Sequence, residues 1–212
     1  PMMFVALPIF AGIAAFFFIL VLTPFAERLR LLDIPDHRKR HGVPVPLVGG
    51  LAIYLVLLSS TLFLGPPLAL SWLIFSTTLL VITGLLDDAF GLGVRTRFAA
   101  QVLASGLMLM GSDFWIQSVG IDLWGLNPLP TWLGVGLTMF AVIGLTNGFN
   151  MVDGIDGLAS GHMMVGLISL AVALIWVVGA HPRFVWLAIL ISAVFAFWLV
   201  NLSLIPVKKV FL

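Results

Sequence analysis

Long apolar runs alternate with short polar connections along the whole chain. The apolar runs cover residues 3–23, 47–64, 69–86, 98–110, 132–145, 158–178 and 184–202. A helix needs about 20 mostly apolar residues to cross the hydrocarbon core of a membrane, and most of these runs approach that length. They lack the period-two alternation of membrane barrel strands, and only helices and closed barrels span membranes. The pattern predicts an all-α, polytopic membrane helical bundle with about seven transmembrane helices.

Composition points to the same class of protein. Of the 212 residues, 61% are hydrophobic and only 9% are charged, and the mean hydropathy is +1.20. Soluble globular proteins do not reach such values. The chain contains no cysteine, which excludes disulfides and thiolate-bound metals within it. No internal repeat or low-complexity linker is visible, so we expect residues 1–212 to form a single transmembrane domain.

The basic residues are divided unequally between the two sides of the membrane. If all seven runs cross it, nine of the ten lysine and arginine residues fall in the odd-numbered connections or the C-terminal tail, and only Arg183 lies opposite. Cytoplasmic connections carry an excess of Lys and Arg. We therefore expect the N-terminus outside and the odd-numbered connections in the cytoplasm. Most of the carboxylates fall on this same predicted side.

Two adjacent carboxylates, Asp87 and Asp88, close the third apolar run. Carboxylates this close repel each other unless a cation or a proton lies between them. Mg²⁺ is a suitable cation because it prefers hard oxygen ligands and phosphate partners. The alternative is a solvated helix end at the membrane interface. Acidic residues at the C-terminal end of a helix oppose the helix dipole, which suggests a compensating cation nearby.

A second polar cluster lies between the fifth and sixth runs, where Asn147, Asn150, Asp153 and Asp156 recur every three residues. Each step of three turns the position by about 60° around a helix axis, so the four cannot share one narrow face. Glycines interrupt the segment. We expect a helix that ends near Asn150, a glycine-bearing turn that holds the aspartates, and a new helix that begins near Gly157. Such a turn suits a metal or a phosphate; a capped polar turn is the alternative.

A third segment, "DIPDHRKRHGVPVPLVGG", is strongly basic and contains Arg38, Lys39 and His41. Its prolines stiffen the approach to the second run, and Gly49 and Gly50 permit close helix packing. An ordinary anchor for anionic head groups would explain the basic residues equally well. The same choice applies after the aspartate pair, where Arg95 and Arg97 either neutralise a pyrophosphate or only set the topology.

The three motifs together resemble the polyprenyl-phosphate N-acetylhexosamine-1-phosphate transferases. "DIPDHRKRHGVPVPLVGG", "LLDDAFGLGVRTRF" and "NGFNMVDGIDGLASG" stand in the order and with the spacing of that family. The first motif looks more like the branch that uses UDP-N-acetylglucosamine than the muramoyl-pentapeptide branch. Family members have about ten spanning helices and continue with a Gly-Asp motif, so we expect this transmembrane catalytic domain to be C-terminally incomplete relative to the family, and the parent protein to be the active unit.

The resemblance implies a role for each motif residue. Asp87 and Asp88 would form the catalytic centre, with Asp87 as a base for the lipid phosphate; direct attack and a covalent aspartyl route both fit two carboxylates. Asn150 and Asp88 would contact Mg²⁺, with Mn²⁺ as a second option. The remaining residues would bind the sugar nucleotide or its phosphates: Arg38, Lys39, His41, Arg97, Asn147, Asp153, Gly154 and Asp156.

The implied reaction transfers a sugar 1-phosphate, with N-acetylglucosamine 1-phosphate as the leading choice, from a UDP-N-acetylhexosamine to a membrane polyprenyl phosphate and releases UMP. It would start a lipid-linked cell-envelope glycan, such as a lipopolysaccharide or teichoic acid, at the cytoplasmic face of a bacterial inner membrane. The alternatives are a phospho-MurNAc-pentapeptide transferase and an ion-coupled transporter. Transporters place ionisable groups near the midplane of the bilayer. The oligomeric state stays open, with a homodimer as one option, and no nucleic-acid partner is expected.

Overall fold

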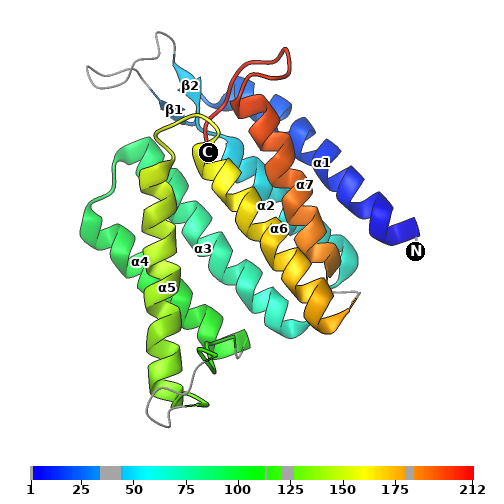
Figure 1. Ribbon diagram of the computed structural model, residues 1–212. Helices are drawn as coiled ribbons and strands as arrows, with labels where there is room; N and C mark the ends of the chain where they lie inside the picture. Colours follow the sequence, from blue (N-terminus) through cyan, green and yellow to red (C-terminus); the bar gives the residue numbers. More distant parts are fainter. Residues whose placement is uncertain (1, 34–43, 113, 121–126, 180–183) are drawn as a thin grey trace. The chain divides into compact units, whose positions relative to one another are not determined.

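The computed structural model describes residues 2–33, 44–112, 114–120, 127–179 and 184–212 (Figure 1). Within these ranges the chain is mostly helical. In chain order the elements are α1 (Met2–Leu22), the short 3-10 helix η1 (Thr23–Phe25), β1 (Leu32–Asp33), β2 (Val45–Pro46), α2 (Gly49–Leu64), α3 (Leu68–Phe90), α4 (Val94–Ser112), α5 (Thr131–Val152), α6 (Leu158–Val178) and α7 (Phe184–Asn201). The predicted all-α class is confirmed, and each of the seven apolar runs forms one helix.

Five helical segments of the described chain are long and apolar enough to cross a membrane: Ala6–Phe25, Leu68–Phe90, Thr131–Val152, Leu158–Val178 and Phe184–Asn201. The other two helices fall short for different reasons. Helix α2 has only 16 residues, about 24 Å at 1.5 Å per residue. Helix α4 has 19 residues, but Arg95, Arg97 and Gln101 occupy its first two turns. The chain is a multi-pass membrane protein.

One small element departs from the helical pattern. Strands β1 and β2 pair antiparallel, with Leu32 opposite Pro46 and Asp33 opposite Val45. Residues that precede a proline are driven away from helical dihedral angles, so Val45 before Pro46 favours an extended backbone. The strand pair brings together the two ends of the basic segment. Residues 34–43 themselves, with Arg38, Lys39 and His41, lie outside the described residues.

The chain divides into two compact units, each described here by itself. The first unit comprises residues 1–64 and 152–212, and therefore α1, α2, α6, α7 and the strand pair. The second comprises residues 65–151, and therefore α3, α4 and nearly all of α5.

Helix α7 is the centre of the first unit and packs against α1, α2 and α6. Its residues Ala193, Val194 and Phe197 are all nearly inaccessible. The start of α2 approaches this helix closely at Gly49, where a Cβ would lie 2.2 Å from Phe197 Cε2 and 2.7 Å from the carbonyl oxygen of Phe211. The predicted close packing at Gly49 is therefore confirmed.

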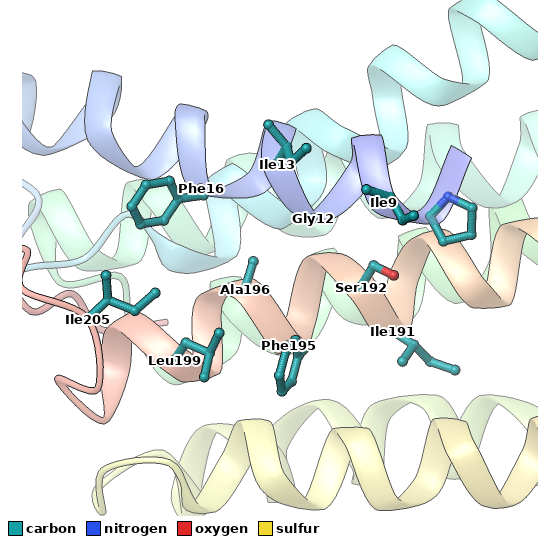
Figure 2. Close-up of a pocket in the computed structure, with 11 residues that line it drawn as sticks. Ile9, Gly12, Ile13, Phe16, Ile191, Ser192, Phe195, Ala196, Leu199 and Ile205 are labelled. Atoms are coloured by element: carbon teal, nitrogen blue, oxygen red, sulfur yellow. The ribbon is translucent and has the colours of Figure 1, made fainter. Parts of the chain in front are cut away.

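A groove of about 460 Å³ runs between α1 and α7 (Figure 2). Ile9, Ile13 and Phe16 line it from α1, and Phe195 and Leu199 line it from α7. The lining is almost wholly apolar, with no charged side chain. Groups that handle a sugar nucleotide must be polar, so this groove is not where the phosphate chemistry occurs.

In the second unit, α3 and α4 form an antiparallel hairpin joined by Gly91–Gly93, and they lie side by side (Figure 1). Gly91 has φ +66° and ends α3; its N–H donates to the carbonyl oxygen of Asp87 at 2.7 Å. A left-handed glycine is a common way to end a helix. At the far end of the hairpin, a Cβ on Gly111 would lie 2.0 Å from the Trp72 ring, so the glycine permits close contact.

Candidate active site

The paired aspartates lie in the last turn of α3, as the sequence predicts. Arg97, from the first turn of α4, donates from Nη1 to Asp87 Oδ2 at 3.0 Å. The carboxylate is 21% exposed and the arginine side chain 35% exposed. A carboxylate at the C-terminal end of a helix opposes the helix dipole. Arg97 places a positive charge beside this carboxylate, a pairing that the sequence did not predict.

A second polar contact links α4 to α5 within the same unit. Asn147 Nδ2 donates to Gln101 Oε1 at 2.8 Å and to the carbonyl oxygen of Ile143 at 2.8 Å. Gln101 is one helical turn after Arg97, so both project from one side of α4. The C-terminal end of α3, the N-terminal end of α4 and the C-terminal end of α5 therefore meet at one polar end of this unit. Asn150 lies one turn beyond Asn147 on α5.

Gln101 was missed by the sequence analysis. It is a single amide in an apolar run and is 9% exposed. A buried amide is costly unless it forms hydrogen bonds, and the partner of Gln101 is 46 residues away in the chain. A lone polar residue early in an apolar helix was the available clue, but it does not identify the partner.

The aspartate turn belongs to the first unit. Helix α5 ends at Val152 and α6 begins at Leu158, so Asp153, Gly154 and Asp156 lie in the turn between them, as predicted. The end of α5 comes two residues later than expected. Gly157 caps α6 with φ +72°, and its N–H donates to Asn201 Oδ1 at 2.6 Å.

The C-terminal tail, residues 202–212, folds back against this turn. Lys209 Nζ forms an ion pair with Asp156 Oδ2 and lies 5.2 Å from the centre of the Phe211 ring. Asn201 Nδ2 donates to the carbonyl oxygen of Val210 at 2.9 Å. In the sequence, Lys209 was only one of the basic residues of the C-terminal tail, and no motif marked Asn201. The structure adds both residues to the candidate site.

The candidate residues thus form two groups. Asp87, Asp88, Arg97, Asn147 and Asn150 belong to the second unit, and Asp153, Gly154 and Asp156 belong to the first. That the two groups share one pocket stays a prediction. His162, in α6, is exposed, and its Nδ1 lies 2.9 Å from the carbonyl oxygen of Leu158 in the same helix.

The donor atoms of the second unit suit a hard cation. Asp88 and Asn150 offer carboxylate and amide oxygens, which Mg²⁺ prefers. Over the described ranges, no group of three or more His, Cys, Asp or Glu side chains is placed to hold a metal by itself. Mg²⁺ is commonly held by one or two carboxylates together with substrate phosphates and water, so this incomplete protein set fits such a site.

Fold and site together define a polytopic membrane protein with paired carboxylates at a helix end and a second acidic turn. The family model described as glycosyl transferase family 4 matches residues 70–212, and the chain belongs to this family. The match includes both acidic motifs.

Three curated relatives illustrate the similarity, and all bear the name undecaprenyl-phosphate alpha-N-acetylglucosaminyl 1-phosphate transferase. The Escherichia coli O157:H7 protein is 31% identical over 88% of this chain and 51% of its own length. The Yersinia pestis protein is 32% identical over 92% of this chain and 54% of its own length. The Salmonella typhi protein is 31% identical over 92% of this chain and 53% of its own length. The chain therefore spans about half the length of the curated relatives it matches.

Proposed function

We propose that the complete protein transfers N-acetylglucosamine 1-phosphate from UDP-N-acetylglucosamine to undecaprenyl phosphate or a similar polyprenyl phosphate. A phosphate oxygen of the lipid attacks the phosphorus that bears the sugar. The bond from that phosphorus to the bridging oxygen breaks, and UMP leaves with the electron pair. The observation that carries the proposal is the Asp87–Arg97 pair in the motif of a family 4 member. The names of the relatives support the choice of sugar and lipid.

Arg97 can serve two partners at once. Its guanidinium has five N–H donors in a planar fork, and the identified contact with Asp87 uses Nη1. The side chain is 35% exposed, so donors remain accessible to a substrate phosphate. Arginine suits this task because its fork matches phosphate oxygens. Arg97 would therefore orient the diphosphate while it holds Asp87 in place beside Asp88.

Asp88 and Asn150 are the residues that would hold Mg²⁺ in the second unit. When bound, the ion would offset the repulsion between two anionic phosphates and stabilise the departing UMP. The lipid phosphate is largely ionised near neutral pH, so Asp87 need not remove a proton for the attack to occur. Its contribution would be to hold the Arg97 guanidinium in place and, with Asp88, to fix the polar end of α3.

The acidic turn of the first unit would bind the nucleotide. Asp153 and Asp156 present carboxylates that can accept hydrogen bonds from a base ring or ribose, and Gly154 offers a backbone N–H without a side chain that blocks approach. Among the described residues, apart from the two chain neighbours of Gly154, no atom lies within 4 Å of the position that a Cβ would take at this glycine. Open space at this glycine is consistent with a substrate-facing turn.

The reaction would take place at the cytoplasmic face of a bacterial inner membrane, with the N-terminus of this chain outside. The distribution of Lys and Arg supports this orientation. The 212 residues contain no cysteine, so single cysteines can report sidedness. A cysteine at Gly93 should react with a membrane-impermeant maleimide only after the cells are opened, and one at Ser118 should react in intact cells. The reverse pattern would refute the orientation.

The decisive test is UMP release by the full-length protein, measured with a panel of UDP-sugars that includes UDP-MurNAc-pentapeptide. UDP-N-acetylglucosamine should be the preferred donor. Asp87→Asn and Asp88→Asn should each lower turnover about 100-fold or more, the scale of loss when one electrostatic group of an active site is removed. Glu27→Gln, which neutralises an exposed carboxylate on the same predicted side, is the matched control. Unchanged turnover in both aspartate variants would refute the site.

A further inference from the structure

The buried amide of Asn201 joins two segments of the candidate nucleotide site. Asn201 is the last residue of α7 and is 4% exposed. We infer that Asn201 is a positioning residue: it does not touch the substrate, but it fixes the acidic turn and the Lys209 tail relative to each other. The inference rests on the proposed function, because it assigns Asp156 and Lys209 to the binding of the sugar nucleotide.

The orientation of the amide follows from its two partners. The N–H of Gly157 can only donate, so the side-chain atom 2.6 Å away must be Oδ1. The carbonyl oxygen of Val210 can only accept, so the atom 2.9 Å away must be Nδ2. Asparagine carries one acceptor and one donor group on a short, planar side chain. Leucine has a similar size but offers neither group.

The first contact holds the turn. Gly157 is the N-cap of α6, and as a glycine it has no side chain to cap the helix. A Cβ at this residue would lie 2.6 Å from Leu202 Cδ2, so the turn lies directly against the end of α7. Asn201 supplies the hydrogen-bond acceptor for the Gly157 N–H at this crowded point.

The second contact holds the tail. Val210 is 0% exposed. The next residue, Phe211, forms two backbone hydrogen bonds. Its N–H donates to the carbonyl oxygen of Pro46 at 2.8 Å, and its carbonyl oxygen accepts from the N–H of Gly49 at 2.9 Å. The tail is thus bonded to the start of α2 on one side and to α7 on the other. Figure 1 shows the C-terminus beside the start of α6.

Each residue bonded by Asn201 is the chain neighbour of one partner in an ion pair. Gly157 follows Asp156, and Val210 follows Lys209; Asp156 and Lys209 then pair with each other. Their side chains are 49% and 29% exposed. Exposed ion pairs contribute little to stability, whereas a buried amide with two partners is costly to disrupt. The amide therefore sets the geometry, and the ion pair can open so that Lys209 reaches a phosphate.

The test compares Asn201→Leu with the wild type in the full-length protein. Asn201→Leu should raise KM for UDP-N-acetylglucosamine about tenfold, the effect of about one lost charge-assisted hydrogen bond, and leave kcat within about twofold. It should also speed tryptic cleavage after Lys208 and Lys209, because Val210 would no longer be held. Unchanged KM together with unchanged cleavage would overturn the inference.

Two further variants separate positioning from general destabilisation. Thr138, in the second unit, is also buried, and its hydroxyl oxygen accepts a hydrogen bond from the Ile116 N–H at 2.9 Å. Thr138→Val removes this acceptor and should change neither KM nor the rate of tail cleavage. If Asn201→Leu does not fold, Asn201→Asp keeps an acceptor for the Gly157 N–H but replaces the donor to Val210 with an oxygen. Tail cleavage should then accelerate, and KM should rise because Lys209 is no longer held. Cleavage at the wild-type rate in Asn201→Asp would overturn the inference.

These readouts also separate this inference from the proposed function. Wild-type protein that releases no UMP from any UDP-sugar would refute the proposed function. Tail cleavage does not depend on turnover, so the link between Asn201 and the tail would still be decided by the cleavage rates of the variants.

Discussion

Two adjacent glycines at the start of α2 provide a sharp test of the packing. Gly49→Ala places a Cβ 2.2 Å from Phe197 Cε2 and 2.7 Å from the carbonyl oxygen of Phe211. Gly50→Ala, among the described residues, brings its Cβ within 4 Å of the carbonyl carbon of Leu212 alone, at 3.7 Å. Contacts of 3.4–4 Å are ordinary for a Cβ. The first substitution therefore forces a shift of more than an ångström, and the second forces none.

The expected cost follows from what has to move. Phe197 is 1% exposed and rigidly packed, and such overpacking costs about 1–3 kcal/mol. The hydrogen bond from the Gly49 N–H to Phe211, 2.9 Å long, contributes about 1 kcal/mol and would be distorted. The helical preference of alanine over glycine offsets about 0.5–1 kcal/mol. We expect Gly49→Ala to destabilise the protein by about 2 kcal/mol and Gly50→Ala to be neutral or slightly stabilising.

The assay is thermal unfolding of the full-length protein in detergent, followed by circular dichroism. A loss of about 2 kcal/mol corresponds to a fall in Tm of roughly 4–8 °C for a domain of this size. Adding Phe197→Leu to Gly49→Ala should recover part of the loss, because contacting residues are not additive. Equal Tm values for Gly49→Ala and Gly50→Ala would refute the packing described here.

Three other substitutions or treatments test the site itself. Gly157→Ala should lower the free energy of unfolding by about 1–2 kcal/mol, because φ at this residue is +72° and the Leu202 side chain is close. Gly154→Ala is the control for stability, and equal melting temperatures for the two variants would contradict this backbone strain. Arg97→Gln should lower the rate of UMP release about tenfold or more. Arg97→Lys should recover only part of that rate, since lysine keeps the positive charge but lacks the planar guanidinium. Full recovery with lysine would argue against two-pronged binding of a phosphate by Arg97. EDTA should abolish UMP release and Mg²⁺ should restore it, whereas turnover that persists in EDTA would exclude the proposed ion.

The acidic turn shows how far local sequence rules reach. Its existence and the start of α6 were predicted correctly, because glycine at 157 can adopt the left-handed conformation that caps the helix. The predicted end of α5 was two residues early. Asn147 lies within α5, as expected for a helix that ends near Asn150, and its amide donates to Gln101 and to the carbonyl oxygen of Ile143. Gly148 was expected to interrupt the segment, yet it also lies within α5.

The residues that the sequence analysis missed share one physical property. Gln101, Asn201 and Lys209 each have a partner far away in the chain, at separations of 46, 44 and 53 residues. Local pattern carries no information on such pairs. A lone amide at the end of an apolar run is indistinguishable from an incidental polar residue until the partner is known.

The sequence by itself determined the class of protein, the helices and the acidic motifs, because hydrophobic burial in a membrane and the conformational freedom of glycine act over a few residues. Only the tertiary structure decided which polar groups neutralise or hold one another. Arg97 could not be paired with Asp87, nor Asn201 with Gly157 and Val210, before the helices were packed. Hydrogen bonds and ion pairs require contact within about 3–4 Å, and packing alone brings distant segments that close.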